Sequence, residues 1–276
     1  MALVTEELTT LAFVQTNGVR LAYQRSGHGA PVLMIMGTGA AGRVWTMHQT
    51  PALNAAGYET IVFDNRGVAP SDAPEGKYSL GDVVADTAGL IEALDLGPCR
   101  IVGTSLGAVV AQELAVTRPE LVRCAVLLAT RARSDAARRA LAAADIAAAE
   151  SGAPPPPAEV AAAVTAFRML SPATLDDDAA VQTWLEVLAL SGGATASGQV
   201  YVEVPGDRRE ALRGVRAPCR VIAFADDLIC PPRLAREVAD AIPDCDYVLL
   251  PECGHLGNLE RPDAVNAAII EFLDRH

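Results

Sequence analysis

The sequence predicts an α/β protein built on a mostly parallel, doubly wound sheet of eight strands, with a helical cap inserted into it. Short apolar runs alternate with segments of helical spacing, and this alternation is typical of a parallel sheet covered by helices on both faces. One long helical stretch interrupts the alternation. With 276 residues, of which 51% are hydrophobic, the chain can bury one large core.

Eight runs are predicted as strands. The first two are joined by Asn17 and Gly18, a pair that favours tight hairpins because both residues tolerate positive φ. The sheet is therefore expected to begin with an antiparallel hairpin and to continue as parallel strands, with helices such as Leu80–Leu94 between them. The predicted strands are Ala12–Gln15, Val19–Gln24, Pro31–Met36, Thr60–Phe63, Cys99–Gly103, Ala125–Leu128, Arg220–Phe224 and Tyr247–Leu250.

The alternation stops between Arg131 and Arg213, where alanine-rich segments replace the strands and four consecutive prolines at 154–157 interrupt them. Helices are predicted at Ser134–Glu150, Ala158–Met169 and Asp178–Leu190. We therefore expect residues 1–130 and 214–276 to form one core, and residues 131–213 to form a helical cap, or lid, over it.

Charge and composition exclude several classes of partner. The formal net charge of −12 and the pI near 4.8 oppose binding to nucleic acid or to anionic membrane surfaces. Acids near the N-terminus stand where a signal peptide needs basic residues, and no apolar stretch is long enough to span a bilayer, so a cytoplasmic location is expected. The six cysteines show no C-x-x-C pairing, which favours free, mostly buried thiols and no metal site.

The strongest chemical motif follows the fifth predicted strand. Gly103-Thr104-Ser105-Leu106-Gly107 is a G-x-S-x-G sequence, and the helical pattern Val109–Val116 comes directly after it. A serine held in a strained turn between strand and helix needs neighbours without a Cβ, because a side chain there would crowd the backbone. Ser105 is therefore the predicted nucleophile, against the alternative of an ordinary glycine-containing turn.

A serine hydroxyl needs a base within hydrogen-bond reach. Of the four histidines, only His255 lies in a loop after the last predicted strand, and sites of doubly wound sheets lie at the carboxyl ends of strands. His255 is the predicted base. His28, His48 and His276 have no such position.

The imidazole in turn needs an acid to orient it. Asp226 and Asp227 directly follow the strand Arg220–Phe224, which gives the chain order Ser, Asp, His expected of such a site. Asp227 is favoured because the acid-x-x-x-Pro spacing to Pro231 is usual in these loops, and Asp226 stays as the alternative.

Two backbone N–H groups should hold the developing oxyanion. Leu106 is expected to supply one, and Thr38, in the glycine-rich loop after the third strand, the other, with Gly37 or Gly39 as alternatives. Gly37 and Gly39 are also expected to let the substrate approach the backbone. Trp45 is expected to line the pocket or to anchor the first helix, and Trp184, Phe167 and Met169 are bulky candidates for pocket walls in the cap, which favours an apolar, uncharged acyl substrate.

With these motifs the sequence resembles the α/β-hydrolase superfamily, which includes small esterases, cofactor-free haloperoxidases, lactonases and C–C hydrolases. The resemblance covers nearly the whole chain outside residues 131–213, and it includes Phe63–Asp72, similar to the family's D-x-R-G-x-G-x-S segment, and Gly254–Pro262. Met36 stands where the family commonly has histidine, and Ala69 and Ala108 replace frequent glycines. The resemblance implies the α/β-hydrolase fold and no cofactor. Ser105 in the nucleophile position argues against an epoxide hydrolase or a dehalogenase, which use aspartate.

The expected reaction is a two-step acyl transfer from an ester, thioester or lactone to water through an acyl-enzyme on Ser105. The same fold could instead carry acyl transfer to an alcohol, C–C bond hydrolysis or elimination, and a third possibility is a ligand-binding protein that reuses the scaffold. The expected partner is a small-molecule substrate, and the chain is expected to be a monomer or a homodimer.

Overall fold

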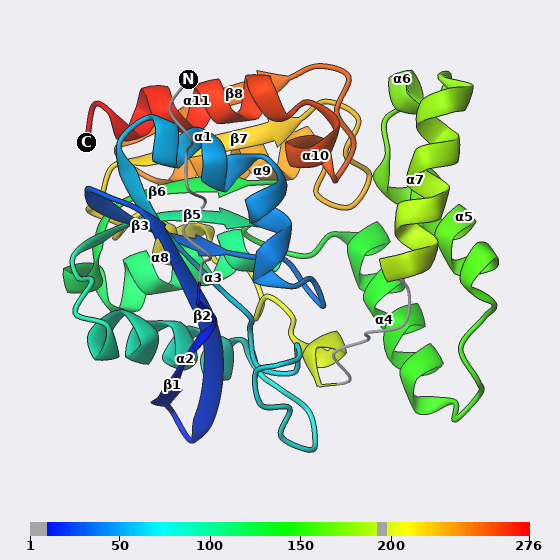
Figure 1. Ribbon diagram of the computed structural model, residues 1–276, viewed down its shortest axis with the longest axis horizontal. Helices are drawn as coiled ribbons and strands as arrows, with labels where there is room; N and C mark the ends of the chain where they lie inside the picture. Colours follow the sequence, from blue (N-terminus) through cyan, green and yellow to red (C-terminus); the bar gives the residue numbers. More distant parts are fainter. Residues whose placement is uncertain (1–9, 192–197) are drawn as a thin grey trace.

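The computed structural model describes residues 10–191 and 198–276, which form one eight-stranded sheet with helices on both faces (Figure 1). The strand order is β1-β2-β4-β3-β5-β6-β7-β8. All neighbours from β4 to β8 pair in parallel, whereas β2 is antiparallel to both β1 and β4. The strands are β1 Ala12–Thr16, β2 Val19–Gly27, β3 Ala30–Ile35, β4 Tyr58–Phe63, β5 Cys99–Thr104, β6 Val122–Leu128, β7 Cys219–Phe224 and β8 Cys245–Leu250. This sheet confirms the predicted fold class.

The antiparallel hairpin forms for the local reason given by its sequence. Asn17 and Gly18 have φ values of 44° and 75°, a conformation that these two residues adopt at low cost. The turn sets the register in which Thr16 pairs with Val19 and Ala12 with Tyr23.

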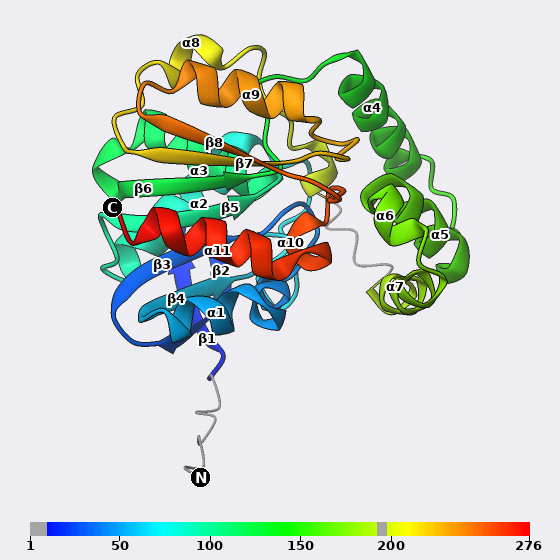
Figure 2. The ribbon, with the colours of Figure 1, turned by 90° about the horizontal axis from the view of Figure 1, so that it is seen from above.

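Helices cover the sheet on two sides, and the strands alternate their side chains between two apolar clusters. In β3, Leu33 and Ile35 belong to one cluster, whereas Val32 and Met34 belong to the other, as the two-residue period of a strand requires. The first cluster includes residues of α2 Leu80–Ala93, α3 Leu106–Thr117, α8 Arg209–Leu212 and α9 Pro232–Ala241. The second includes residues of η1 Gly42–Met47, α1 Gln49–Ala55 and α11 Pro262–Leu273 (Figure 2). The short η2 Pro119–Leu121 joins α3 to β6.

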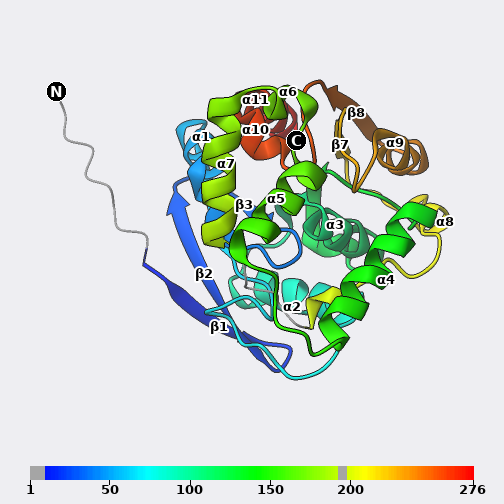
Figure 3. The same ribbon diagram turned by 90° about the vertical axis from the view of Figure 1, so that its right-hand side faces the viewer.

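Between β6 and β7 the chain leaves the sheet and forms a group of helices at one end of the molecule (Figures 1 and 2). Three of them, α4, α5 and α7, lie where helices were predicted. The helices of this group are α4 Ala136–Glu150, α5 Ala158–Met169, α6 Pro172–Leu175 and α7 Asp178–Ser191, and η3 Gln199–Tyr201 follows them. Viewed from that end, α4, α5 and α7 lie in front of the sheet (Figure 3). We call residues 131–213 the helical insertion.

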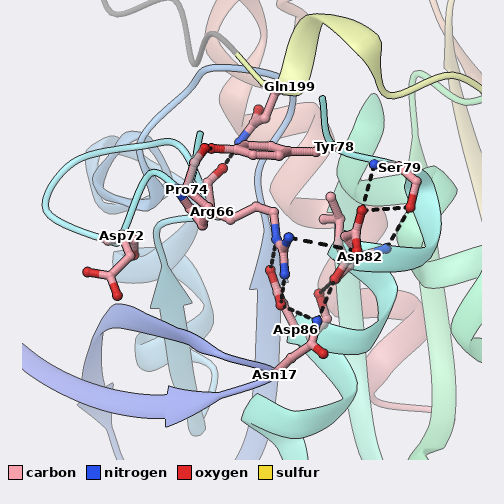
Figure 4. Close-up of polar contacts among 12 residues, drawn as sticks. Asn17, Arg66, Asp72, Pro74, Tyr78, Ser79, Asp82, Asp86 and Gln199 are labelled. Atoms are coloured by element: carbon pink, nitrogen blue, oxygen red, sulfur yellow. Dashed lines mark hydrogen bonds and ion pairs between the residues drawn. The ribbon is translucent and has the colours of Figure 1, made fainter. Parts of the chain in front are cut away.

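A buried ion pair ties the loop after β4 to α2 (Figure 4). Arg66 Nε and Nη2 donate to the two carboxylate oxygens of Asp86, and Asn17 donates to Asp86 Oδ1 at 2.8 Å. Burial strengthens such a bidentate contact, and the hydrogen bonds to Asp86 raise the pKa of Arg66. The family-like segment around Arg66 is thus fixed to α2 and to the hairpin turn.

None of the helices in residues 10–191 and 198–276 has the length and apolar character needed to cross a lipid bilayer. The six cysteines are free, and five of them are buried.

Candidate active site

Ser105 sits at the turn between β5 and α3 with φ 53° and ψ −116°. Positive φ is costly for a residue with a Cβ, so the surrounding structure must hold this conformation. The two flanking glycines explain how it fits: a Cβ on Gly103 would lie 2.4 Å from the carbonyl oxygen of Gly107, and a Cβ on Gly107 would lie 2.1 Å from that of Ile35. The turn has the strained geometry that its motif predicts.

Three side chains predicted to act together lie in hydrogen-bond contact, although they come from three loops far apart in the sequence. The Nε2 atom of His255 is 3.1 Å from Ser105 Oγ, and its Nδ1 atom is 2.8 Å from Asp227 Oδ2. His255 is 6% exposed and Asp227 is 2% exposed, so water competes little with either contact. Ser105, at the surface of the pocket, is only partly buried.

The structure distinguishes the two adjacent aspartates. Asp227 contacts His255, and its second oxygen, Oδ1, accepts the backbone N–H groups of Ile229 and Cys230 at 2.7 and 2.8 Å. These two bonds fix the carboxylate so that Oδ2 faces the imidazole. The backbone N–H of Asp226 donates to the carbonyl of Cys253, and among the described residues His255 Nδ1 bonds the carboxylate of Asp227 and not that of Asp226.

Asp227, Cys230 and His255 also form the one group in the described residues whose ligand atoms are close enough to hold a metal ion, within 4.8 Å of one another. Their chemistry fits a hydrogen-bonded pair better than a metal centre. Asp227 Oδ2 and His255 Nδ1 bond each other at 2.8 Å, and Asp227 Oδ1 already accepts two backbone N–H groups, so the lone pairs that a metal ion needs are engaged.

A carboxylate behind His255 connects its loop to the helical insertion. Glu260 Oε2 accepts the N–H of Gly254 at 2.7 Å, and its Oε1 accepts both the N–H and the hydroxyl of Ser171, each at 2.8 Å. The N–H of Leu256 also donates to the carbonyl of Met169. The insertion is therefore docked directly on the loop that carries His255.

The loop after β3 passes close to Ser105. A Cβ on Gly37 would lie 3.3 Å from Ser105 Cβ, and Thr38 lines the pocket at Ser105. The N–H of Gly39 instead donates to Gln199 Oε1 at 2.8 Å, so Gly39 does not offer a free donor. The N–H groups of Thr38 and Leu106 have no acceptor among the residues the structure describes.

Gln199 carries no sequence motif, yet it fixes this loop. Its Oε1 accepts from the N–H of Gly39, and its Nε2 donates to the carbonyl of Arg66 at 2.6 Å (Figure 4). Gln199 is 1% exposed. It therefore joins the Gly39 loop to the Arg66 loop, and no local pattern marks it, because both partners lie more than a hundred residues earlier in the chain.

The bulky pocket candidates do not line the pocket at Ser105. Trp45 is fully buried in the second apolar cluster, because η1 packs its indole against β3 and β4, so it anchors this segment rather than meeting a substrate. Phe167 is 72% exposed, and Trp184 and Met169 are partly buried outside the pocket lining.

Apolar and charged groups line the pocket together. Leu80, Val109, Val202, Val204 and Ile229 supply apolar walls. Arg131, Arg138 and Glu203 bring charge into the same pocket, and sequence reasoning missed all three. The available signal was the position of Arg131, two residues after Ala129 at the carboxyl end of β6, where sites of such sheets lie.

Comparison with known proteins agrees with this fold. A family profile described as "Alpha/beta hydrolase family" matches residues 21–268. The protein named "Putative non-heme bromoperoxidase BpoC" of Mycobacterium tuberculosis is 46% identical over 257 residues, which cover 92% of this chain and 97% of that protein. Its crystal structure superposes with a TM-score of 0.88, over 92% of this chain and 96% of that one.

More distant relatives carry hydrolase names. One named "Putative carbamate hydrolase RutD" of Azorhizobium caulinodans is 26% identical over 261 residues, which cover 91% of this chain and 94% of that protein. A solved hydrolase of Pseudomonas aeruginosa is 28% identical, with a TM-score of 0.83 over 96% of this chain and 98% of that one.

Proposed function

The chain belongs to the alpha/beta hydrolase family, and within it we propose a serine hydrolase that cleaves a carboxylic ester, thioester or lactone through an acyl-enzyme on Ser105. The observation that carries this proposal is the continuous hydrogen-bonded series from Ser105 Oγ through His255 to Asp227, at 3.1 and 2.8 Å, at the edge of a pocket. Relatives with hydrolase names support an enzyme of this class.

Each side chain has a defined role in the proposed reaction. His255 removes the proton of Ser105 as the oxygen attacks the carbonyl carbon, and Asp227 stabilises the resulting imidazolium. His255 then gives the proton to the leaving alcohol, thiol or lactone oxygen. In the second step His255 takes a proton from water, the hydroxide attacks the acyl carbon, and Ser105 regains its proton as the carboxylic acid leaves.

Charge develops on the carbonyl oxygen in both steps, and free N–H donors stabilise it. We propose the N–H groups of Thr38 and Leu106 for this role, because both residues line the pocket and neither N–H has an acceptor in the described part of the chain. Gly37 then serves by leaving space beside Ser105 rather than by donating.

A fluorophosphonate probe tests the proposal directly. It should label one residue, Ser105, and the labelled protein should lose hydrolysis of p-nitrophenyl esters, thioesters and lactones of graded length. The relative rates across that panel identify the bond type. Absence of labelling in folded protein, together with no turnover of any panel member, would count against a serine hydrolase.

Gln199→Leu should lower kcat by about 10- to 100-fold with a smaller change in KM, because a displaced oxyanion donor is felt mainly in the transition state. The measurement is steady-state kinetics on the best panel substrate, with Tm recorded alongside. Gln182→Leu, at an exposed glutamine of α7, is the matched control and should change neither constant. A Gln199→Leu protein that is less stable but has wild-type kcat would assign Gln199 a purely structural role.

A second reaction of the same acyl-enzyme is favoured by the name of the 46% identical relative. Attack of hydrogen peroxide in place of water releases a peracid and free Ser105, and the peracid then oxidises bromide to hypobromous acid and becomes the carboxylate. A bromination assay with acetate and peroxide separates the two reactions. Bromination that depends on Ser105 and exceeds ester hydrolysis would favour this second function.

A further inference from the structure

Two arginines share one carboxylate in the pocket beside Ser105. Arg131 lies just after β6, Arg138 lies in the first turn of α4, and Glu203 follows η3, so three separate segments bring these charges to one place. Arg131 is 5% exposed, and the side chain of Arg138 is 16% exposed. Both guanidinium groups are therefore largely removed from water.

Their pairing with Glu203 is loose. Arg138 Nη2 lies 3.2 Å from Glu203 Oε1, and Arg131 Nη2 lies 3.9 Å from Oε2. Arg131 Nη1 donates to the thiol of Cys230 at 3.5 Å, which is a neutral partner. The Nε atoms of both arginines, Nη1 of Arg138 and Oε1 of Glu203 are buried without a hydrogen-bond partner in the described part of the chain.

Neighbouring arginines show what complete pairing looks like in this protein. Arg133 bonds both oxygens of Glu237 at 2.6 and 2.7 Å, and Arg208 bonds both oxygens of Glu113 at 2.7 and 2.8 Å. Those two arginines are more exposed than Arg131, so they need a partner less. A buried guanidinium that lacks a bidentate carboxylate partner raises the free energy of the folded protein, unless another anion accepts its N–H groups.

The other acids near the two arginines are already engaged. Asp135 caps the N-terminus of α4 and pairs with Arg233, and Asp145 lies 3.8 Å from Arg168. Burial, followed by the like charge of Arg131, lowers the pKa of Arg138, whereas the bonds to Glu237 raise that of Arg133. The charged side chains that line the pocket are two arginines and one glutamate, so they sum to one positive charge, although the whole chain is acidic.

We propose that the substrate carries a carboxylate, which Arg131 and Arg138 bind in the pocket while Ser105 attacks the ester or thioester carbonyl of the same molecule. This inference rests on the proposed serine hydrolase function and narrows its substrate. A carboxylate that takes the place of Glu203 can accept N–H groups from both guanidiniums, whose Nη2 atoms face that position. The proposed carboxylate substrate replaces the expectation of an uncharged, purely apolar one. The apolar walls of the pocket still accommodate the carbon chain of the substrate.

Two p-nitrophenyl esters of equal chain length test the proposal: the hydrogen glutarate, whose acyl chain ends in a carboxylate, and the neutral pentanoate. The wild-type protein should favour the glutarate ester by about tenfold or more in kcat/KM, the effect of one charge-assisted bond. Arg131→Met and Arg138→Met keep the apolar stem but remove the charge. Each should lower the glutarate-to-pentanoate ratio by about tenfold.

Glu203→Gln provides a change in the opposite direction. Removing the competing carboxylate frees both arginines, so the ratio should rise. Arg213→Met, at an exposed arginine paired with Glu210, is the control and should leave the ratio at its wild-type value. A wild-type ratio at or below one, or a ratio unchanged by Arg131→Met, Arg138→Met and Glu203→Gln together, would overturn the carboxylate proposal while leaving a serine hydrolase intact.

A binding measurement keeps the two proposals separate. Calorimetric titration of glutarate into the Ser105→Ala protein detects the arginine site without any turnover. Glutarate binding that is lost in the Ser105→Ala, Arg138→Met double variant supports the carboxylate site, even if the wild-type protein hydrolyses neither ester. If neither ester is hydrolysed, the proposed hydrolase function fails while the carboxylate site stands. Absence of glutarate binding to folded Ser105→Ala protein counts against the carboxylate site.

Discussion

Ser105→Ala should lower kcat for the best ester substrate by about 10⁶-fold. The rate that remains should be close to the uncatalysed rate, increased only by the stabilisation that the oxyanion donors supply. The reason is that the acyl-enzyme cannot form without Ser105 Oγ, the atom 3.1 Å from His255 Nε2. The members of such a series act as a unit, so removal of the nucleophile removes most of the benefit of His255 and Asp227 as well.

The measurement is single-turnover and steady-state hydrolysis with purified protein of known concentration, and the wild-type protein is also titrated at its active site. Ser151→Ala, at an exposed serine after α4, is the matched control and should leave kcat unchanged. A Ser105→Ala protein that turns over its substrate within tenfold of the wild type would show that another group is the nucleophile.

Asp227→Asn should lower kcat by about 10⁴-fold with little change in fold. Oδ1 of Asp227 accepts the N–H groups of Ile229 and Cys230, so the asparagine must keep its carbonyl oxygen there. Its amide NH₂ then faces His255 Nδ1 as a donor, in the place where Oδ2 accepts in the native chain. Nδ1 must therefore become the acceptor, the ring proton moves to Nε2, and His255 can no longer accept the proton of Ser105.

Asp226→Asn is the control for this variant, because the two positions are adjacent and only one contacts His255. It should retain kcat close to the wild-type value. The pair is compared on one substrate across a range of pH, with circular dichroism to confirm folding. Equal losses in both variants would show that the effect comes from loop charge and not from the tautomer of His255.

Local sequence patterns were sufficient to predict much of the fold. The eight predicted strands lie within two or three residues of β1 to β8, and Ala158–Met169 has the bounds that were predicted. These features depend on side-chain alternation and on breakers such as Asn17-Gly18, which act over a few residues. The order of β4 before β3 in the sheet does not follow from such patterns, because it depends on pairing between distant segments.

The pocket at Ser105 was the part of the molecule that the sequence predicted least well. Trp45 reads locally as a bulky residue after a glycine-rich loop, yet packing of η1 places it in the core. Arg131 and Arg138 read as ordinary charged residues at the start of a helical stretch, and only the position of Glu203 beside them reveals their incomplete pairing. The net charge of a buried pocket depends on charged side chains from several separate segments of the chain. No single segment shows it.

By itself, the sequence determined the eight strands and the helices α4, α5 and α7, and marked Ser105 and His255 as the candidate nucleophile and base, because periodicity and motif spacing are properties of neighbouring residues. Only the tertiary structure decided that Asp227 rather than Asp226 faces the imidazole, that Gln199 holds the loop of Gly39, and that two arginines meet beside Ser105. Each of these depends on distances of a few ångströms between segments far apart in the chain, and those distances are set by packing of the whole molecule.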